Sequence, residues 1–216
     1  YRQRKWSATS LVTWELGQIR MALQTLTLIE QRIATGSTFP ELSLFDCHAC
    51  HHGMADVRWE PSAHALGPGK VRLNDSAFAM VQLIANGVDK DLADTLRRGL
   101  SDLHRASQKS THLAAATARL RMPIERLEAE TLAAGDAGAV PAAQLLSMIV
   151  TTFSTTRTDY AVAEQAVMAI DMLSAHLGLR AQYEAWLDRL FDAVADDDAF
   201  DPDAFVAAIQ AMPKPG

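Results

Sequence analysis

The amino-acid sequence predicts an all-α fold, a helical bundle of about seven helices interrupted by one long irregular loop. Apolar residues recur every three or four positions along most of the chain, which is the spacing that buries one face of a helix. No segment alternates apolar and polar residues for long enough to predict a β-strand. Proline and glycine gather in residues 37–74, where the helical spacing is lost, so this stretch is expected to be the loop.

The first predicted helix begins near Leu11 and ends before Gly36, a residue type that commonly follows a helix end. Its apolar stripe consists of Leu11, Trp14, Ile19, Leu23, Leu26, Ile29 and Ile33. Further helices are expected near residues 75–87, 89–107, 110–133, 141–156, 158–177, 180–195 and 202–212.

Two of these helices begin at recognisable caps. Asn74 or Asp75 precedes the helix at 75–87, and Gly87 is its expected end. Asp201 precedes a helix that has Pro202 at its first position, where proline is well tolerated. The acidic residues before Asp201 lack the glycine and the oxygen ligand that an EF-hand needs, so an acidic loop is predicted there and no calcium site.

Composition and charge bound the domain organisation and exclude some partners. The chain has 216 residues, 49% of them hydrophobic, and a formal net charge of -6. We expect residues 1–133 to form the domain that holds the loop and residues 134–216 to add C-terminal helices to the same bundle. The alternative is that a connector of small residues at 134–140 divides two lobes. No stripe of lysine and arginine points to nucleic acid, and no apolar run is long enough to span a membrane.

Both cysteines of the chain lie in the loop, within LFDCHACHHGM at residues 44–54. A zinc site would use the two thiolates with two further ligands such as His52 and His64, but the usual closely spaced pair of downstream histidines is missing. A redox dithiol would need a strand before the motif and a helix start after it, and the sequence predicts neither. Zinc and a dithiol therefore remain the alternatives to a third interpretation.

The third interpretation is the covalent attachment of one haem c, because Cys47, Cys50 and His51 form a complete Cys-x-x-Cys-His pattern. The two thiols would bond to the porphyrin vinyl groups, and the two residues between them let one turn of chain span both. His51 follows directly and would be the proximal ligand of the iron. The pattern uses every cysteine of the chain, which favours haem attachment over the alternatives.

Other loop residues are predicted to contact the haem. His52 would hydrogen-bond a propionate or ligate a neighbouring haem, or else lie on the surface beside the haem edge. Arg58, together with Lys70 and Arg72, would pair with propionates or remain a solvated loop charge. Trp59 would stack on the porphyrin or pack the loop against the helices.

The ligand on the far side of the iron decides between an electron carrier and a haem enzyme. His48 lies inside the attachment motif, and His52 and Met54 lie on the proximal side, so the distal ligand is expected from a more remote position. His64 is favoured by chain reach, and His104 is the second candidate. If His104 is not a ligand, we expect a boundary residue with one ring nitrogen facing solvent. The other candidates are Met80, His112, Met148, Met168, Met172 and His176.

Several of these remaining candidates have simpler structural explanations. His112 is expected in an exposed first turn, and His176 at a helix end, where a histidine favours the C-terminal dipole. Met148, Met168 and Met172 fall on apolar helix faces, where methionine usually fills the core.

A run of residues around the cysteines resembles the C-terminal region of bacterial multihaem cytochrome c family proteins. These proteins carry a stretch of the type Phe-Asp-Cys-x-x-Cys-His-His followed by a tryptophan. The matching residues are Phe45, Asp46, Cys47, Cys50, His51, His52 and Trp59. The resemblance implies electron transfer in the periplasm or outside the cell, with further haems upstream. This chain departs in having one attachment motif, so it is either a piece whose other haems precede Tyr1 or a monohaem relative.

We therefore expect an exported c-type cytochrome domain whose partners are redox proteins or neighbouring haem domains. The chain lacks an initiator methionine and a signal peptide, which predicts a processed product or a piece of a longer precursor. The alternative function is a haem enzyme or a small-ligand sensor with an open distal position. A third possibility is an interaction module, in which the helices after residue 134 bind a partner.

Overall fold

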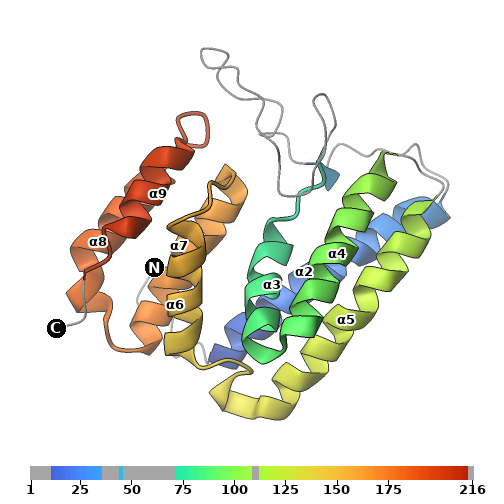
Figure 1. Cartoon of the computed structure of the whole chain (residues 1–216), viewed down its shortest axis with the longest axis horizontal. Coiled ribbons are helices and arrows are strands. Elements are labelled where there is room, and N and C mark those ends of the chain that lie inside the picture. The colour runs from blue at the N-terminus through green and yellow to red at the C-terminus, as the bar shows by residue number, and fades with distance from the viewer. Residues whose placement is uncertain (1–10, 36–43, 46–71, 109–111, 214–216) are drawn as a thin grey trace. The chain divides into compact units, whose positions relative to one another are not determined.

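The computed structural model describes residues 11–35, 44–45, 72–108 and 112–213, and this part of the chain is all-α, as predicted (Figure 1). These residues form eight α-helices and, in place of any β-strand, a single isolated bridge. The chain divides into two compact units, one of residues 18–129 and one of residues 1–17 with residues 130–216. The boundary between the units falls inside the first described helix and inside the helix Leu113–Ala134.

The described helices lie where the apolar spacing predicted them. They are α2 (Leu11–Ala34), α3 (Ser76–Val88), α4 (Lys90–Ser107), α5 (Leu113–Ala134), α6 (Ala142–Phe153), α7 (Tyr160–His176), α8 (Arg180–Ala193) and α9 (Pro202–Gln210), with a 3-10 turn η4 (Gly135–Ala137) before α6. One detail differs from the expectation, because helix α3 continues through Gly87 to Val88. Helix α5 contains Pro123, whose missing N–H removes one helical hydrogen bond without ending the helix.

In the unit of residues 18–129, α3 and α4 pack against each other and are joined at Asp89. The Asp89 carboxylate accepts hydrogen bonds from the backbone N–H groups of Asp91 at 2.8 Å and Leu92 at 3.4 Å. These bonds, the one from Asp91 foremost, hold the pKa of Asp89 below its ordinary value. Asp89 thus ends one helix and caps the next, which explains how the chain reverses without a longer loop.

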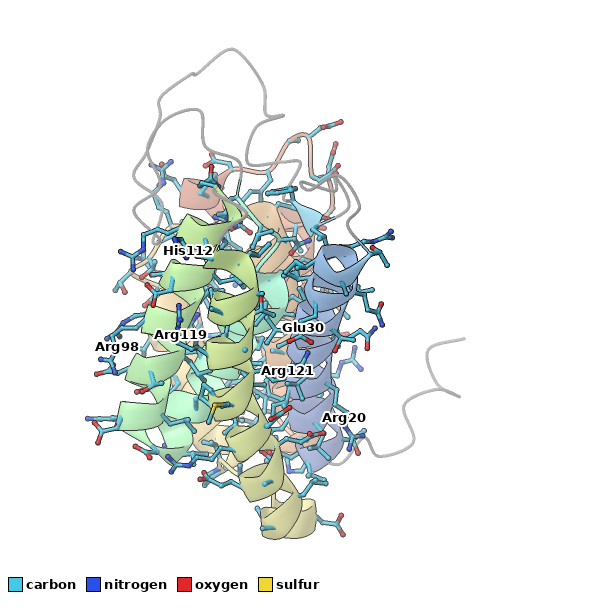
Figure 2. The ribbon with its side chains drawn as sticks, turned by 90° about the vertical axis from the view of Figure 1, so that its right-hand side faces the viewer. Arg20, Glu30, Arg98, His112, Arg119 and Arg121 are labelled. Atoms are coloured by element: carbon cyan, nitrogen blue, oxygen red, sulfur yellow. The ribbon has the colours of Figure 1, made fainter. Side chains whose placement is uncertain are left out.

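Ion pairs tie α5 to α2 within the same unit (Figure 2). The guanidinium of Arg121 donates to Glu30 at 2.8 and 3.1 Å and to the hydroxyl of Thr27 at 3.0 Å. Seven residues further along α5, Glu128 accepts a hydrogen bond from Arg20 at 2.8 Å. The two-point contact of Arg121 with a carboxylate is the stronger type of surface pair, because its planar donor matches the two oxygens.

The core of this unit is made of apolar side chains from all four helices, and one glycine sets the distance between two of them. A Cβ added at Gly99 on α4 would lie 3.0 Å from Cδ1 of Leu120 on α5, so the small residue permits close packing. Large side chains of this core with less than 2% exposed include Ile19, Leu26, Ile29, Met80, Ile84, Leu96, Leu100, Leu103 and Leu113.

In the other unit, α6 packs on α7, α7 on α8 and α8 on α9 (Figure 1). Aromatic side chains from these helices and their connections meet edge to face or tilted, as their ring quadrupoles favour. The contacting pairs are Phe153–Phe205, Tyr160–Phe200, Tyr183–Trp186 and Phe200–Phe205. Trp186 is 1% exposed, and its indole N–H donates to the carbonyl of Ala208 at 2.8 Å, which fixes α8 against α9.

The longest described helix, α2, has 24 residues and carries Glu15, Arg20, Glu30 and Arg32 along its length. None of the described helices combines the length and the apolar character that a membrane span requires.

Candidate functional site

Most of the residues predicted to hold the haem lie in residues 46–71, outside the part of the chain that the structure describes. They are Cys47, Cys50, His51, His52, Arg58, Trp59 and His64. Their roles as cysteine attachment points, iron ligands and haem contacts therefore remain predictions. The structure describes the residues that flank this segment, Leu44 and Phe45 before it and residues 72–74 after it.

The two ends of the segment are held together by backbone pairing. Phe45 and Leu73 form an isolated antiparallel bridge, and the N–H of Asn74 donates to the carbonyl of Leu44 at 2.9 Å. Leu44, Phe45 and Leu73 are all buried, with at most 8% of each exposed. The segment with the cysteine motif thus starts and ends at one anchored point, and Cys47 is only two residues beyond Phe45.

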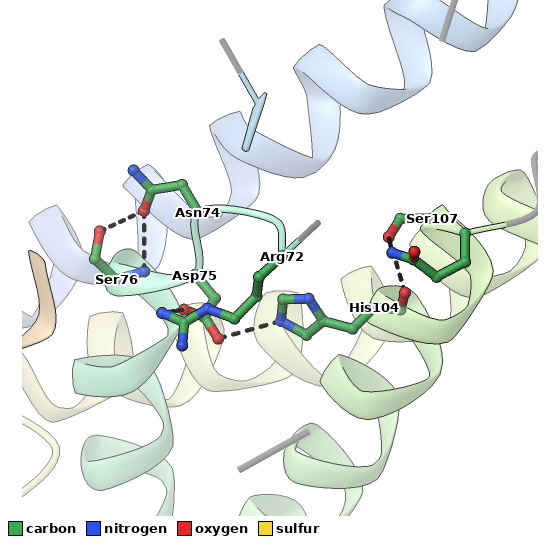
Figure 3. Close-up of polar contacts among 7 residues, drawn as sticks. Arg72, Asn74, Asp75, Ser76, His104 and Ser107 are labelled. Atoms are coloured by element: carbon green, nitrogen blue, oxygen red, sulfur yellow. Dashed lines mark hydrogen bonds and ion pairs between the residues drawn. The ribbon is translucent and has the colours of Figure 1, made fainter. Parts of the chain in front are cut away.

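A buried polar cluster lies at this anchor point, on the return side (Figure 3). The Asp75 carboxylate contacts Arg72 through Oδ1, 3.2 Å from a guanidinium nitrogen, and His104 through Oδ2, 3.1 Å from Nε2. The exposed fraction of the side chain is 17% for Arg72, 8% for Asp75 and 0% for His104. We refer to these three residues as the anchor cluster. Asp75 is its centre, because each of the other two contacts a different oxygen of the same carboxylate.

Because its carboxylate belongs to the anchor cluster, Asp75 does not cap α3, although its position before that helix suggests a cap. Asp75 is the residue before α3, but its side chain makes no capping hydrogen bond there. The side chain of Asn74 instead accepts from the N–H of Ser76 at 3.2 Å and from the Ser76 hydroxyl at 2.8 Å. The prediction of a cap at Asn74 or Asp75 thus located the helix start. The carboxylate itself is used for a contact 29 residues further along the chain.

His104, the second predicted distal ligand, lies in the last turn of α4. The expectation that it would otherwise be a boundary residue facing solvent is wrong, because it is completely buried with Nε2 against Asp75. The carboxylate orients the ring and selects its tautomer, as carboxylates do for functional histidines. If His104 binds iron in this arrangement, the ligating atom is Nδ1.

The remaining predicted histidine and methionine candidates are dispersed. His112 is exposed at the start of α5, and His176 is exposed in the last turn of α7, as expected for residues with no ligand role. Met80 and Met172 are buried core residues of separate units. Met168 is 48% exposed, so its predicted place in the core is wrong.

The sequence did not predict the buried carboxylate of Glu15, which lies in the unit that contains the C-terminal helices. Its completely buried carboxylate accepts the backbone N–H groups of Ala139 at 2.7 Å and Val140 at 3.1 Å. Burial raises the pKa of Glu15, and the two backbone hydrogen bonds oppose that rise. A signal was present in the sequence: Glu15 lies four residues after Leu11 and four before Ile19, within the apolar stripe of α2.

No known protein family, curated protein or solved structure matches this chain. The assignment of a function therefore depends on the chemistry of its residues.

Proposed function

We propose that this chain is a c-type cytochrome domain that carries one covalently attached haem and transfers electrons outside the cytoplasm. The observation that carries the proposal is the complete Cys47-x-x-Cys50-His51 pattern, which uses both cysteines of the chain. The donor set suits haem c, with two thiols for the porphyrin vinyl groups and one imidazole for the iron. When bound, the haem would supply a one-electron redox couple.

The described residues fit such a cofactor at the ends of the segment that would hold it. Phe45 and Leu73 are paired and buried, so the backbone on both sides of residues 46–71 is held by the helical unit. Attachment of a large rigid group to a loop is more favourable when the loop ends are already fixed, because less conformational entropy is then lost. The anchored ends thus support the attachment of a haem in this segment.

The function outside the cytoplasm follows from the chemistry of attachment, which is normally carried out in exported chains. The partners proposed for the domain are redox proteins or neighbouring haem domains. The resemblance to multihaem cytochromes supports this choice of partner.

The proposal is tested by the intact mass of the chain produced together with a haem c maturation system. We expect a single species whose mass exceeds that of the polypeptide by one haem. A variant in which Cys47→Ala and Cys50→Ala are combined should take up no covalent haem. A mass decreased by two hydrogens would indicate a disulfide, and native-mode detection of one bound zinc would indicate a metal site. Either result in the absence of haem would overturn the proposal.

The alternative, a haem enzyme or sensor, is decided by the optical spectrum of the reduced, loaded protein with and without carbon monoxide. A low-spin spectrum that the gas leaves unchanged is expected for an electron carrier with two axial ligands. Rapid binding of the gas to a high-spin iron would instead support an open distal position. Repeating the measurement with His64→Ala and with His104→Ala identifies the distal ligand, because removal of the true ligand should open the iron to the gas.

A further inference from the structure

We infer that Asp75 is the positioning residue of the loop that would hold the haem: through Arg72 and His104 it fixes the point at which this loop rejoins the helices. The part of the inference that concerns a haem in this loop rests on the proposed function. The anchoring itself rests on described residues alone.

The first argument is the use that the structure makes of the Asp75 carboxylate. An aspartate before a helix is ordinarily explained as a cap, and that explanation fails here because the side chain makes no capping bond. The carboxylate is 8% exposed and contacts one cation and one imidazole. A buried carboxylate is costly unless such partners compensate it, so all three residues are held in one arrangement.

The second argument is the location of the cluster relative to the backbone pairing. Arg72 directly precedes Leu73, and Asp75 directly follows Asn74, so the cluster encloses the two residues that pair with Phe45 and Leu44. His104 comes from α4, where its carbonyl accepts the Ser107 hydroxyl at 2.8 Å. Asp75 therefore links the paired loop ends to a helix of the core, which the local hydrogen bonds alone would not do.

The consequence for the site is that the anchor cluster limits the positions open to the haem. Small shifts of a supporting residue change the environment of a cofactor even when that residue does not touch it. The charges of Asp75 and Arg72 are poorly screened by solvent, so loss of the negative partner should influence the potential of a haem in the adjoining loop.

The test compares Asp75→Asn with a matched control, Asp94→Asn, in the full chain. Asp94 is also an aspartate paired with an arginine, Arg97 at 2.7 Å, but its side chain is 46% exposed and lies on the outside of α4. In the haem-free chain we expect Asp75→Asn to accelerate hydrogen exchange of the Asn74 amide by about tenfold or more. The reason is that the variant loses the buried carboxylate that contacts Arg72 and His104. Exchange of amides in the middle of α5 should stay unchanged, and Asp94→Asn should resemble the wild type throughout.

In the haem-loaded chain, Asp75→Asn should raise the midpoint potential, because loss of a poorly screened negative charge favours the reduced iron. Asp94→Asn should leave the potential unchanged. Global destabilisation alone would not produce this shift. Wild-type exchange rates at Asn74, or a wild-type potential in the loaded variant, would overturn the inference.

Two additional variants keep the test decisive if Asp75→Asn does not fold. Arg72→Gln leaves the contact between Asp75 and His104 and should accelerate the same amide by a smaller factor. The double variant Arg72→Gln with Asp75→Asn should be less disturbed than Asp75→Asn, because it leaves no guanidinium without a carboxylate. Unchanged exchange in Arg72→Gln would overturn the inference. If the wild-type chain takes up no haem, the proposed function fails, while the exchange experiment still decides whether Asp75 anchors the loop.

Discussion

At the scale of single residues, two buried carboxylates of this protein contact residues that are distant in the sequence. Asp75 contacts His104, and Glu15 accepts hydrogen bonds from residues more than a hundred positions away. A local pattern assigns both to ordinary roles, a cap and a polar position on a helix. Their actual roles depend on partners brought near by the fold, which explains why sequence reasoning located the residues but not their function.

Replacing Glu15 by glutamine is expected to lower the free energy of unfolding by about 1–3 kcal/mol. The two backbone N–H groups of Ala139 and Val140 each use a different carboxylate oxygen, and in glutamine one of these oxygens becomes an NH2 group. One buried N–H then faces a second donor. Urea unfolding at neutral pH, followed by circular dichroism, measures the effect. A variant as stable as the wild type would show that the connector between α5 and α6 (residues 135–141) is held by other contacts.

The same residue should give the protein a pH-dependent stability. Since burial raises the pKa of folded Glu15 above its ordinary value of 4.5, the folded state binds this proton more tightly than the unfolded state does. The stabilisation from protonated Glu15 is therefore complete below the unfolded pKa and is lost as pH rises through the folded pKa. The stability of the wild type relative to Glu15→Gln should decrease with pH across that window. A difference that stays constant from pH 4 upward (an acidic range set by the ordinary carboxyl pKa) would contradict this.

Gly138 lets the connector between α5 and α6 approach α2 closely. We expect Gly138→Ala to destabilise the protein by about 1–3 kcal/mol or more. Its φ is +75°, and an added Cβ would lie 2.8 Å from Leu11 and 2.9 Å from the Glu15 carboxylate. Gly135→Ala is a control for a positive φ without a collision, because Gly135 has a φ of +62° and nothing lies within 4 Å of its Cβ position. Thermal unfolding should show the larger loss for Gly138→Ala, which combines the collision with a φ of +75° and a ψ of 162° that only glycine adopts readily. Equal losses at the two positions would contradict this prediction.

At the scale of helices, most boundaries can be predicted from capping residues in the sequence. Asp201 caps α9 as predicted, accepting the N–H groups of Asp203 at 2.8 Å and Ala204 at 3.3 Å, with Pro202 at the first position. Gly87 fails as a stop signal because Asp89 supplies the actual turn into the next helix. A capping side chain thus outweighs a nearby glycine in deciding where one helix ends and another begins.

The pairing of α8 with α9 is expected to depend on Trp186. Its indole N–H donates at 2.8 Å to the carbonyl of Ala208, one of the last four carbonyls of α9, which have no partner within the helix. Trp186→Phe keeps an aromatic ring but removes this donor and leaves a small void, so a loss of about 1–3 kcal/mol is expected. Urea unfolding followed by circular dichroism measures it. The conservative surface change Arg189→Lys on the same helix should have no comparable effect.

At the scale of the whole molecule, the all-α class and the order of the helices could be predicted from apolar spacing alone. The division into units could not be read the same way, because α2 and α5 are continuous and yet contribute to both. The first turns of α2 belong with the C-terminal helices because Glu15 binds the segment after η4, a contact between distant positions. The proline and glycine content predicts a loop over residues 37–74, most of which lie outside the described residues. The bridge between Phe45 and Leu73 joins residues 28 positions apart, and no local pattern in the sequence predicts it.

These helical cores also bear on the order of folding and cofactor attachment. Combining Cys47→Ala with Cys50→Ala should abolish covalent haem and leave the far-ultraviolet circular dichroism of the haem-free wild type unchanged. The reason is that the described helices already bury a continuous set of apolar side chains in each unit, and described residues supply caps and ion pairs between them. The loaded wild type should unfold at a higher temperature than the variant, since a group bound only by the folded state stabilises it. Loss of the helical signal in the variant would mean that the cysteines, or the group they hold, are needed for the helices to form, as metals are in small domains that fold only on binding.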